Sequence, residues 1–429
     1  MRAQPCSLVL WAILACNCLG TIGCSEDEPV QPTTGIIQGA VTEAGTSLPV
    51  SSVRVVVFDA NTNAPLLSLT TGGDGSYSIE LGPGTYLLKF ARQGYEDLPP
   101  RDISPLPVTV TVGQTTPYSV QMFKSSLTNT GAISGKVLAA GSGVPGCLVV
   151  AEGTASGFSA TTDASGVYLI TNVQAGSYTV KAWKSGYTST AAAVNVTAAT
   201  EQKDVNVTLS AGVSGSVSGS ITFLATTNIE VDVSLLNLKT RETVPGLSTT
   251  TISSNFTIAN VPDGTYLARA TYKNDGKVMD PDWIIKNGEP IVTVSGGATT
   301  RNFSVTGAVD LVSPTNPPSD TQPIEVVKDT LRFTWVAYPS TDDYVIEVIN
   351  QNGTVIWGGF ASNWTVKKIT IPKTQTSIVF NADASATEQL TSGKFYRWKI
   401  YSSKNDAKEP TGWKLISNSE DQRGLIRIK

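Results

Sequence analysis

A hairpin-like stretch that occurs three times constrains the fold of this chain more than any other feature. The clearest copy runs from Asp163 to Ala182, and related stretches begin at Asp74 and Asn255. A glycine followed two residues later by a tyrosine recurs in the three copies at Gly84, Gly176 and Gly264. The period is about 90 residues, which is too long for a solenoid unit and suits one small β-sandwich per repeat.

The first half of each copy has the pattern of a half-buried strand. A turn residue leads into alternating positions, and the aromatic and aliphatic members fall on one face. In the first copy Tyr77, Ile79 and Leu81 share a face, and in the second Tyr168 and Ile170 do so. These runs predict the inner faces of sandwich strands.

The tyrosine after each repeated glycine begins a second alternating run. We expect these tyrosines to be buried at a corner, with a backbone partner for each hydroxyl group. We expect the glycines before them to adopt positive φ, which costs little only for glycine. Aromatic side chains at strand spacing belong to the core far more often than to ligand platforms, so packing is their expected role.

Composition supports an all-β chain and excludes several classes of function. The 429 residues include 38 glycines and no histidine, and the net charge is −4 with a pI near 5.1. Without histidine there is no Ser-His-Asp triad, and most zinc sites are excluded. The acidic balance and the absence of long basic runs argue against nucleic acid as a partner. Carboxylate pairs could still act on glycosidic bonds, but short strands leave no large cleft-forming domain, so we expect no enzyme and no cofactor.

The N-terminal 24 residues have the pattern of a targeting peptide. An apolar run from Leu8 to Ala15 follows Met1 and Arg2, and it is too short to cross a bilayer. Thr21 to Cys24 resembles the lipobox of bacterial lipoproteins, with Thr where the family usually has Leu. The resemblance implies that Cys24 is lipidated and begins the mature chain, whereas a plain secretory signal is the alternative.

The residues after Cys24 form a short tether, residues 25–34. It opens with the acidic stretch Ser25 to Glu28 and continues with Pro and Thr. Acidic residues at this place resemble the surface-export signal of some Gram-negative lipoproteins. The resemblance implies an extracytoplasmic protein, anchored by its acyl chains to outer-membrane lipid and exposed at the surface.

Cysteine use adds one structural expectation. Of the five cysteines, only Cys147 lies beyond the signal peptide and the lipidation position. The mature chain therefore has no internal disulfide, although it is exported. We expect Cys147 to be a small buried apolar residue.

The three repeats resemble a known domain family. In residues 35–125 the features are a first strand with Gly-x-Val, the Asp-Gly-x-Tyr turn at Asp74 and the Gly94–Tyr95 pair. Residues 131–211 repeat them with Gly135, Val137 and Gly186. These motifs resemble the carboxypeptidase regulatory-like family, which implies a prealbumin-like sandwich related to starch-binding-like domains. Residues 212–311 form a divergent third copy that begins at Gly215.

A stiff proline-containing linker, Pro314 to Ser319, precedes a fourth module at residues 322–429. Trp335 lies on its expected second strand, and the Leu390-to-Tyr396 spacing is that of a tyrosine corner. These features resemble a fibronectin type III domain. The fold class is therefore all-β, with tandem Ig-like/prealbumin-like β-sandwiches arranged as beads on a string.

Tryptophans supply the candidate binding residues. We expect Trp335 and Trp398 to be core residues, whereas Trp357, Trp364 and Trp413 lie at strand ends or turns beside Gly, Asn or Lys. Carbohydrate-binding modules build sugar-stacking platforms at such places, although packing is the more frequent role of such rings. A calcium site could be drawn from Asp280, Asp282, Asp342 and Asp343. No full acidic loop surrounds them, so we expect solvated turns and no metal.

These features together predict a non-catalytic envelope lipoprotein built as an extended rod. We expect it to bind carbohydrate or to act in adhesion, with a polysaccharide or an envelope protein as partner. The binding surface would lie on the fourth module, farthest from the lipid. The alternative is a structural spacer or a protein-binding subunit of an envelope assembly, for which exposed edge strands would serve.

Overall fold

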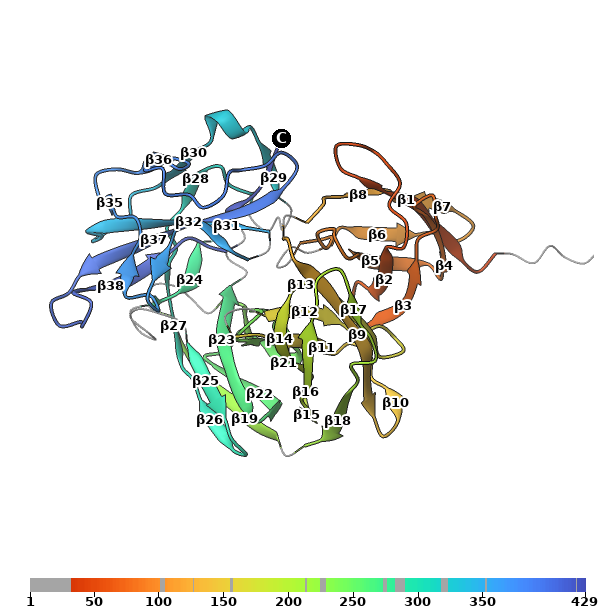
Figure 1. The fold of residues 1–429 in the computed structure, drawn as a ribbon. Helices are drawn as coiled ribbons and strands as arrows, with labels where there is room; N and C mark the ends of the chain where they lie inside the picture. The colour runs from red at the N-terminus through yellow and green to blue at the C-terminus, as the bar shows by residue number, and fades with distance from the viewer. Residues whose placement is uncertain are drawn as a thin grey trace, which may run out of the picture.

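The computed structural model describes residues 32–100, 105–125, 127–154, 157–212, 214–223, 229–272, 276–281, 290–317, 323–351, 353–421 and 423–429. Regular structure in these ranges is almost entirely β-strand, and their only named helix is one 3-10 turn, η1 (Lys328–Thr330). Within the same ranges, no helix has the length and hydropathy needed to span a bilayer. The all-β class with tandem sandwiches is confirmed (Figure 1).

The first sandwich is built on the strand β1 (Gly35–Glu43). It pairs antiparallel with β4 (Ser76–Leu81) and parallel with β7 (Thr115–Pro117) and β8 (Val120–Met122). The facing sheet has the order β3-β2-β5-β6. Its strands are β2 (Arg54–Asp59), β3 (Pro65–Thr70), β5 (Gly84–Ala91) and β6 (Pro107–Val110). Side chains on β4 alternate between exposed and buried, as the two-residue period predicts.

The second sandwich repeats this topology. Its central strand β9 (Thr130–Ala139) pairs antiparallel with β13 (Val167–Gln174) and parallel with β17 (Glu201–Gln202) and β18 (Val207–Ala211). The facing sheet has the order β12-β11-β14-β16. The remaining strands are β10 (Ser142–Gly143), β11 (Leu148–Glu152), β12 (Gly157–Thr161), β14 (Gly176–Trp183), β15 (Tyr187–Ser189) and β16 (Ala192–Val196). Cys147 is fully buried, as expected.

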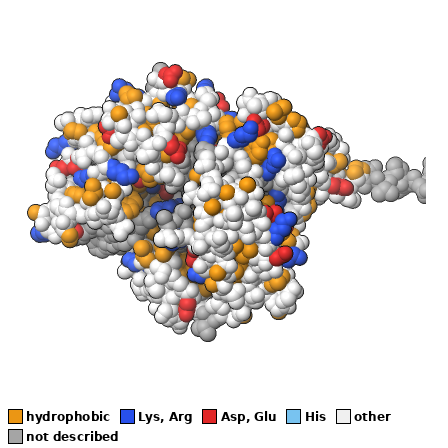
Figure 2. All heavy atoms as spheres, viewed as in Figure 1, with side chains coloured by type: hydrophobic (Ala, Val, Ile, Leu, Met, Phe, Trp, Pro, Cys, Tyr) orange, Lys and Arg blue, Asp and Glu red, His pale blue; other side chains and the backbone are white. Residues whose placement is uncertain are grey.

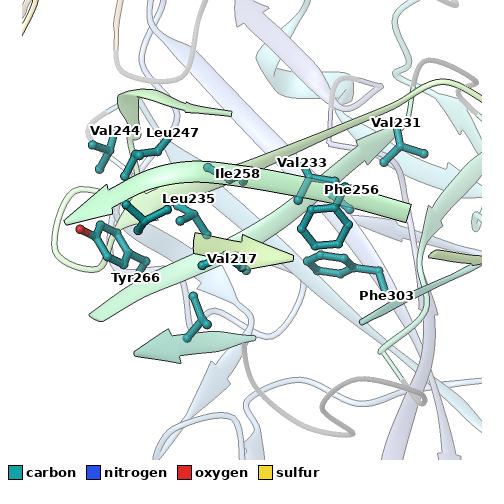
Figure 3. Close-up of a cluster of buried hydrophobic side chains, with 14 of the residues drawn as sticks. Val217, Val231, Val233, Leu235, Val244, Leu247, Phe256, Ile258, Tyr266 and Phe303 are labelled. Carbon is teal, nitrogen blue, oxygen red and sulfur yellow. The ribbon is translucent and has the colours of Figure 1, made fainter. Parts of the chain in front are cut away.

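The third sandwich keeps the same plan although its sequence diverges. The central strand β19 (Ser214–Phe223) pairs antiparallel with β22 (Asn255–Pro262) and parallel with β26 (Ala298–Thr300) and β27 (Phe303–Gly307). The other strands are β20 (Val231–Asn237), β21 (Thr243–Thr251), β23 (Gly264–Tyr272), β24 (Lys277–Met279) and β25 (Ile291–Val294). Phe256 and Phe303 meet in its core at 5.6 Å between ring centroids (Figure 3).

Glycines on the central strands explain part of the repeat. A Cβ atom built on Gly39, Gly135 or Gly219 would lie 1.9, 2.2 or 1.8 Å from a carbonyl oxygen of the adjacent connection, which joins the two strands that pair parallel with the central strand. Each of these glycines lies opposite an aromatic residue of the partner strand, namely Tyr77, Tyr168 and Phe256. Only glycine leaves room for this close approach of the backbone. Gly219, rather than the expected Gly215, is therefore the counterpart of Gly135.

The corner tyrosines make the predicted backbone contact, and Tyr86 and Tyr266 are buried as expected, whereas Tyr178 is only half-buried. The hydroxyl groups of Tyr86, Tyr178 and Tyr266 donate to the carbonyl oxygens four residues earlier, at 2.8, 2.9 and 2.8 Å. The expected positive φ occurs at Gly176, with 153°, whereas the other two repeated glycines serve a different purpose. A Cβ atom on Gly84 or Gly264 would lie 3.2 or 3.3 Å from the tyrosine hydroxyl, and neither residue has positive φ. Glycine there makes room for the ring as it folds back toward the corner.

The fourth sandwich combines a three-stranded and a seven-stranded sheet. The smaller sheet contains β28 (Leu311–Ser313), β30 (Arg332–Trp335) and β36 (Ser377–Val379). The larger contains β29 (Ile324–Val326), β31 (Asp343–Asn350), β32 (Val355–Gly358), β35 (Ile371–Pro372), β37 (Phe395–Asn405), β38 (Trp413–Asn418) and β39 (Leu425–Ile428). Trp335 and Trp398 are buried in its core, as expected. Tyr396 Oη accepts a hydrogen bond from Thr391 N at 3.0 Å, which is the expected corner contact. The fibronectin type III assignment stays a prediction.

The sandwiches do not form an extended rod. Lys394 Nζ of the fourth sandwich lies 2.7 Å from Glu96 Oε1 of the first, and both side chains are largely buried. In Figure 1 the first sandwich (red to orange) lies beside the fourth (blue), with the second and third next to one another below them. The expected extended rod is wrong because side chains of the first and fourth sandwiches meet.

The second and third sandwiches share an apolar interface. Leu148 and Val150 of β11 belong to the hydrophobic cluster of the third sandwich. The ring of Trp183 meets that of Tyr266 edge-on, with the centroids 5.7 Å apart. These apolar side chains would be exposed to water if the sandwiches separated, so their burial stabilises the association of the two sandwiches.

Candidate binding cleft between the third and fourth sandwiches

The three candidate tryptophans lie in different environments. Trp357 is 1% exposed, and its Nε1 donates to Asp383 Oδ1 at 2.7 Å. Trp413 is 8% exposed, with Phe360 stacked at 5.9 Å and Lys367 Nζ 4.5 Å from its ring centroid. Neither ring can offer a free face to a sugar, so the expected stacking role is wrong for both. Trp364 alone remains partly exposed.

Trp364 is carried by a small hairpin of the fourth sandwich. The hairpin consists of β33 (Phe360–Ala361) and β34 (Val366–Lys367). The ring of Trp364 stacks on Phe360 at 4.5 Å between centroids and meets Tyr401 edge-on at 5.7 Å. Within the described ranges, no further ring or cation stacks on it. The aromatic cluster therefore fixes the position of Trp364 and leaves it in contact with solvent.

The backbone of this hairpin is held in an unfavourable conformation. Ser362, Asn363 and Trp364 have φ of 50°, 53° and 68°, three successive residues in the left-handed region. For residues other than glycine this region costs roughly 1–2 kcal/mol each. Such strain is retained where the surrounding structure fixes it, and it concentrates at binding sites.

Trp364 lines a cleft of about 340 Å³ between the third and fourth sandwiches. Strand β23 supplies one side, from Leu267 to Tyr272. Strands β31 and β37 and the β33–β34 hairpin supply the other. This volume lies within the range of small-molecule sites, which is roughly 300–1,000 Å³. Sequence reasoning missed the cleft because it arises from how two sandwiches pack.

The acidic groups of the cleft are already engaged. Lys399 Nζ forms an ion pair with Asp421, and Tyr401 Oη donates to Glu347 Oε1 at 3.0 Å. Burial opposes ionisation of Asp421, but the charges of Lys399, Arg269 and Arg397 outweigh it and hold the pKa of Asp421 well below its usual value. Burial, followed by the nearby Glu347 carboxylate, raises the pKa of Tyr401. Asp421 is therefore charged and Tyr401 neutral at pH 7.

Arg269 differs from these groups. It lies on β23, half-buried, between the buried residues Ala268 and Ala270. Its guanidinium acts on Asp421 only through the longer-range charge interaction, and no hydrogen bond or ion pair joins it to any residue that the structure describes. The Tyr272 hydroxyl also has no hydrogen-bond partner among the described residues, but its oxygen is fully occluded and so belongs to the interior of the cleft's wall.

The remaining candidates do not assemble into a site. Asp343 pairs with Lys367 at 2.7 Å and Asp342 with Lys373 at 3.8 Å, while Asp280 is buried; Asp282 lies outside the described residues. Across the described ranges, no group of three or more Asp, Glu, Cys or His side chains could hold a metal ion. Cys24 also lies outside these ranges. Figure 2 shows acidic and basic side chains interspersed on the face that it draws, with no continuous patch of one sign.

Solved structures resemble parts of this chain only remotely. The Bacillus anthracis TIE protein is 16% identical, the match covers 64% of this chain and 51% of that one, and the TM-score is 0.19. BcpA, the major pilin subunit of Bacillus cereus, is 11% identical over 63% of this chain and 99% of its own, with a TM-score of 0.18. A streptococcal ancillary pilin is 12% identical with the same coverages and a TM-score of 0.19. Scores this low carry no functional inference.

No curated protein matches the chain significantly. A protein-family model, however, matches two segments of it. The model of the carboxypeptidase regulatory-like domain matches residues 36–123 and again residues 132–210. The third sandwich lies outside both matches although it has the same strand topology. The first two β-sandwiches are therefore similar to the carboxypeptidase regulatory-like domain over these residues.

Proposed function

We propose that this protein is a non-catalytic lipoprotein of the bacterial cell envelope, exposed at the surface, that binds carbohydrate in the cleft between its third and fourth sandwiches. The observation that carries the proposal is Trp364, a partly exposed ring on a strained hairpin beside a cleft of about 340 Å³. A rigidly held aromatic ring is suited to stack on the apolar face of a sugar.

The binding half of the proposal is tested by affinity electrophoresis of the full chain in gels containing polysaccharide. Trp364→Ala should lose retention by tenfold or more, because an aromatic stack contributes on the order of 1–3 kcal/mol. Val366→Ala is the matched control, since Val366 is exposed on the same hairpin. Retention of neither wild type nor control on any gel, with an envelope protein recovered in pull-downs, would favour the assembly-subunit alternative.

The proposed lipid anchoring and surface exposure depend on Cys24 and the acidic residues that follow it. Cys24→Ala should abolish labelling by a fatty-acid analogue and leave the protein as an uncleaved precursor or in the soluble fraction. Labelling that persists in this variant would exclude lipidation at Cys24. Protease accessibility on intact cells then separates surface exposure from a periplasmic location.

A further inference from the structure

We propose that the cleft selects saccharides that carry a carboxylate, and that Arg269 binds this group; the inference rests on the carbohydrate-binding function proposed above. Arg269 is a half-buried guanidinium in the lining of the cleft, without a hydrogen bond or ion pair to any described residue. A guanidinium presents a fixed fork of donors that matches a carboxylate through two parallel hydrogen bonds.

The charges around Arg269 favour an anionic ligand. Among the described residues that line the cleft, four are cationic (Arg241, Arg269, Arg397, Lys399) and three carry carboxylates (Glu347, Glu420, Asp421). The Asp421 and Glu347 carboxylates are held by Lys399 and Tyr401. With these contacts made, the N–H donors of Arg269 remain available to a ligand.

The two ligand-facing groups come from different sandwiches and act on different parts of a sugar. Trp364 reaches the cleft from the β33–β34 hairpin, whereas Arg269 reaches it from β23. The ring suits the apolar face of a pyranose, and the guanidinium suits a charged substituent at its edge. A uronic-acid unit carries both features in one ring, so this class of saccharide fits the arrangement.

The test compares oligosaccharides of galacturonate, glucuronate and mannuronate with their methyl esters, which keep the sugar faces and lose the charge. Isothermal titration of the full chain in detergent should show at least one acid that binds about tenfold more tightly than its ester. Arg269→Gln should remove this preference, so that the acid binds no more tightly than its ester. Arg332→Gln, an exposed arginine on β30 outside the cleft, is the matched control.

The outcomes separate this inference from the proposed function. If acids and esters bind equally, or if Arg269→Gln keeps the preference, the carboxylate inference is wrong while carbohydrate binding stands. If neither acids nor esters nor neutral polysaccharides bind, carbohydrate binding itself is wrong. Loss of affinity for both acid and ester in Arg269→Gln would assign this residue a general role in shaping the cleft and overturn the selective one.

Discussion

Arg54 of the first sandwich and Asp163 of the second form an ion pair, with 2.8 Å between Nη2 and Oδ2 and side chains only 14% and 7% exposed. Asp163 is the turn residue that opens the second hairpin copy. Its Oδ1 accepts from the backbone N–H groups of Ser165 and Val167, at 2.9 and 3.0 Å. One oxygen of this carboxylate thus stabilises its own turn, and the other binds the neighbouring sandwich.

Asp163→Ala should lower the free energy of unfolding by about 3 kcal/mol, because it leaves the Arg54 guanidinium buried without its counter-charge. Denaturant titration of the full chain measures this loss. Asp74→Ala is the matched control, since Asp74 has the same place in the first copy but contacts only its own exposed turn. Equal losses in the two variants would mean that the turn, and not the ion pair, accounts for the effect.

The same carboxylate predicts how stability depends on pH. Burial opposes its ionisation, but hydrogen bonds from Ser68, Val167 and Ser165 and the charge of Arg54 hold the pKa of Asp163 below its ordinary value. A lowered folded-state pKa contributes stability above the unfolded pKa of about 3.9, and this contribution is lost as pH falls through the folded value. The gap in melting temperature between wild type and Asp163→Asn should therefore be constant at neutral pH and shrink below about pH 4. A gap unchanged at pH 3 would contradict this assignment.

The sequence predicts the features that are set by residues close together in the chain. Alternation and corner tyrosines are set within one hairpin, so the roles of Tyr77, Tyr86 and Cys147 could be inferred correctly. The ion-pair partner of Arg54 and the place of Arg269 in the cleft depend on how whole sandwiches pack, which no local pattern encodes. The glycines that follow Trp357 suggested an exposed turn, whereas the second sheet of its sandwich covers the ring.

Trp357→Ala should destabilise the fourth sandwich by roughly 3–5 kcal/mol, because it removes a buried ring that contacts Phe333 and Phe380. Trp357→Phe keeps most of the packing and removes the donor to Asp383, so its loss should be smaller. Unfolding followed by tryptophan fluorescence gives both values, with Trp364→Ala as the partly exposed comparison. A Trp357→Ala protein of wild-type stability would show that the core tolerates the cavity.

The contact between Lys394 and Glu96 should keep the first and fourth sandwiches together. Glu96 is 5% exposed, so Lys394→Glu places two carboxylates together where water screens them poorly. Gly393, with φ of 80°, lies against the ring of Phe123 of the first sandwich, so the repulsion acts within a close-packed contact. We expect Lys394→Glu to enlarge the radius of gyration measured by small-angle X-ray scattering, and the charge-swapped pair Lys394→Glu with Glu96→Lys to restore it. Lys203 and Glu201 form an exposed pair that involves the second sandwich alone, so Lys203→Glu should leave the radius of gyration unchanged. A wild type already as extended as the Lys394→Glu variant would mean that this contact does not hold in solution.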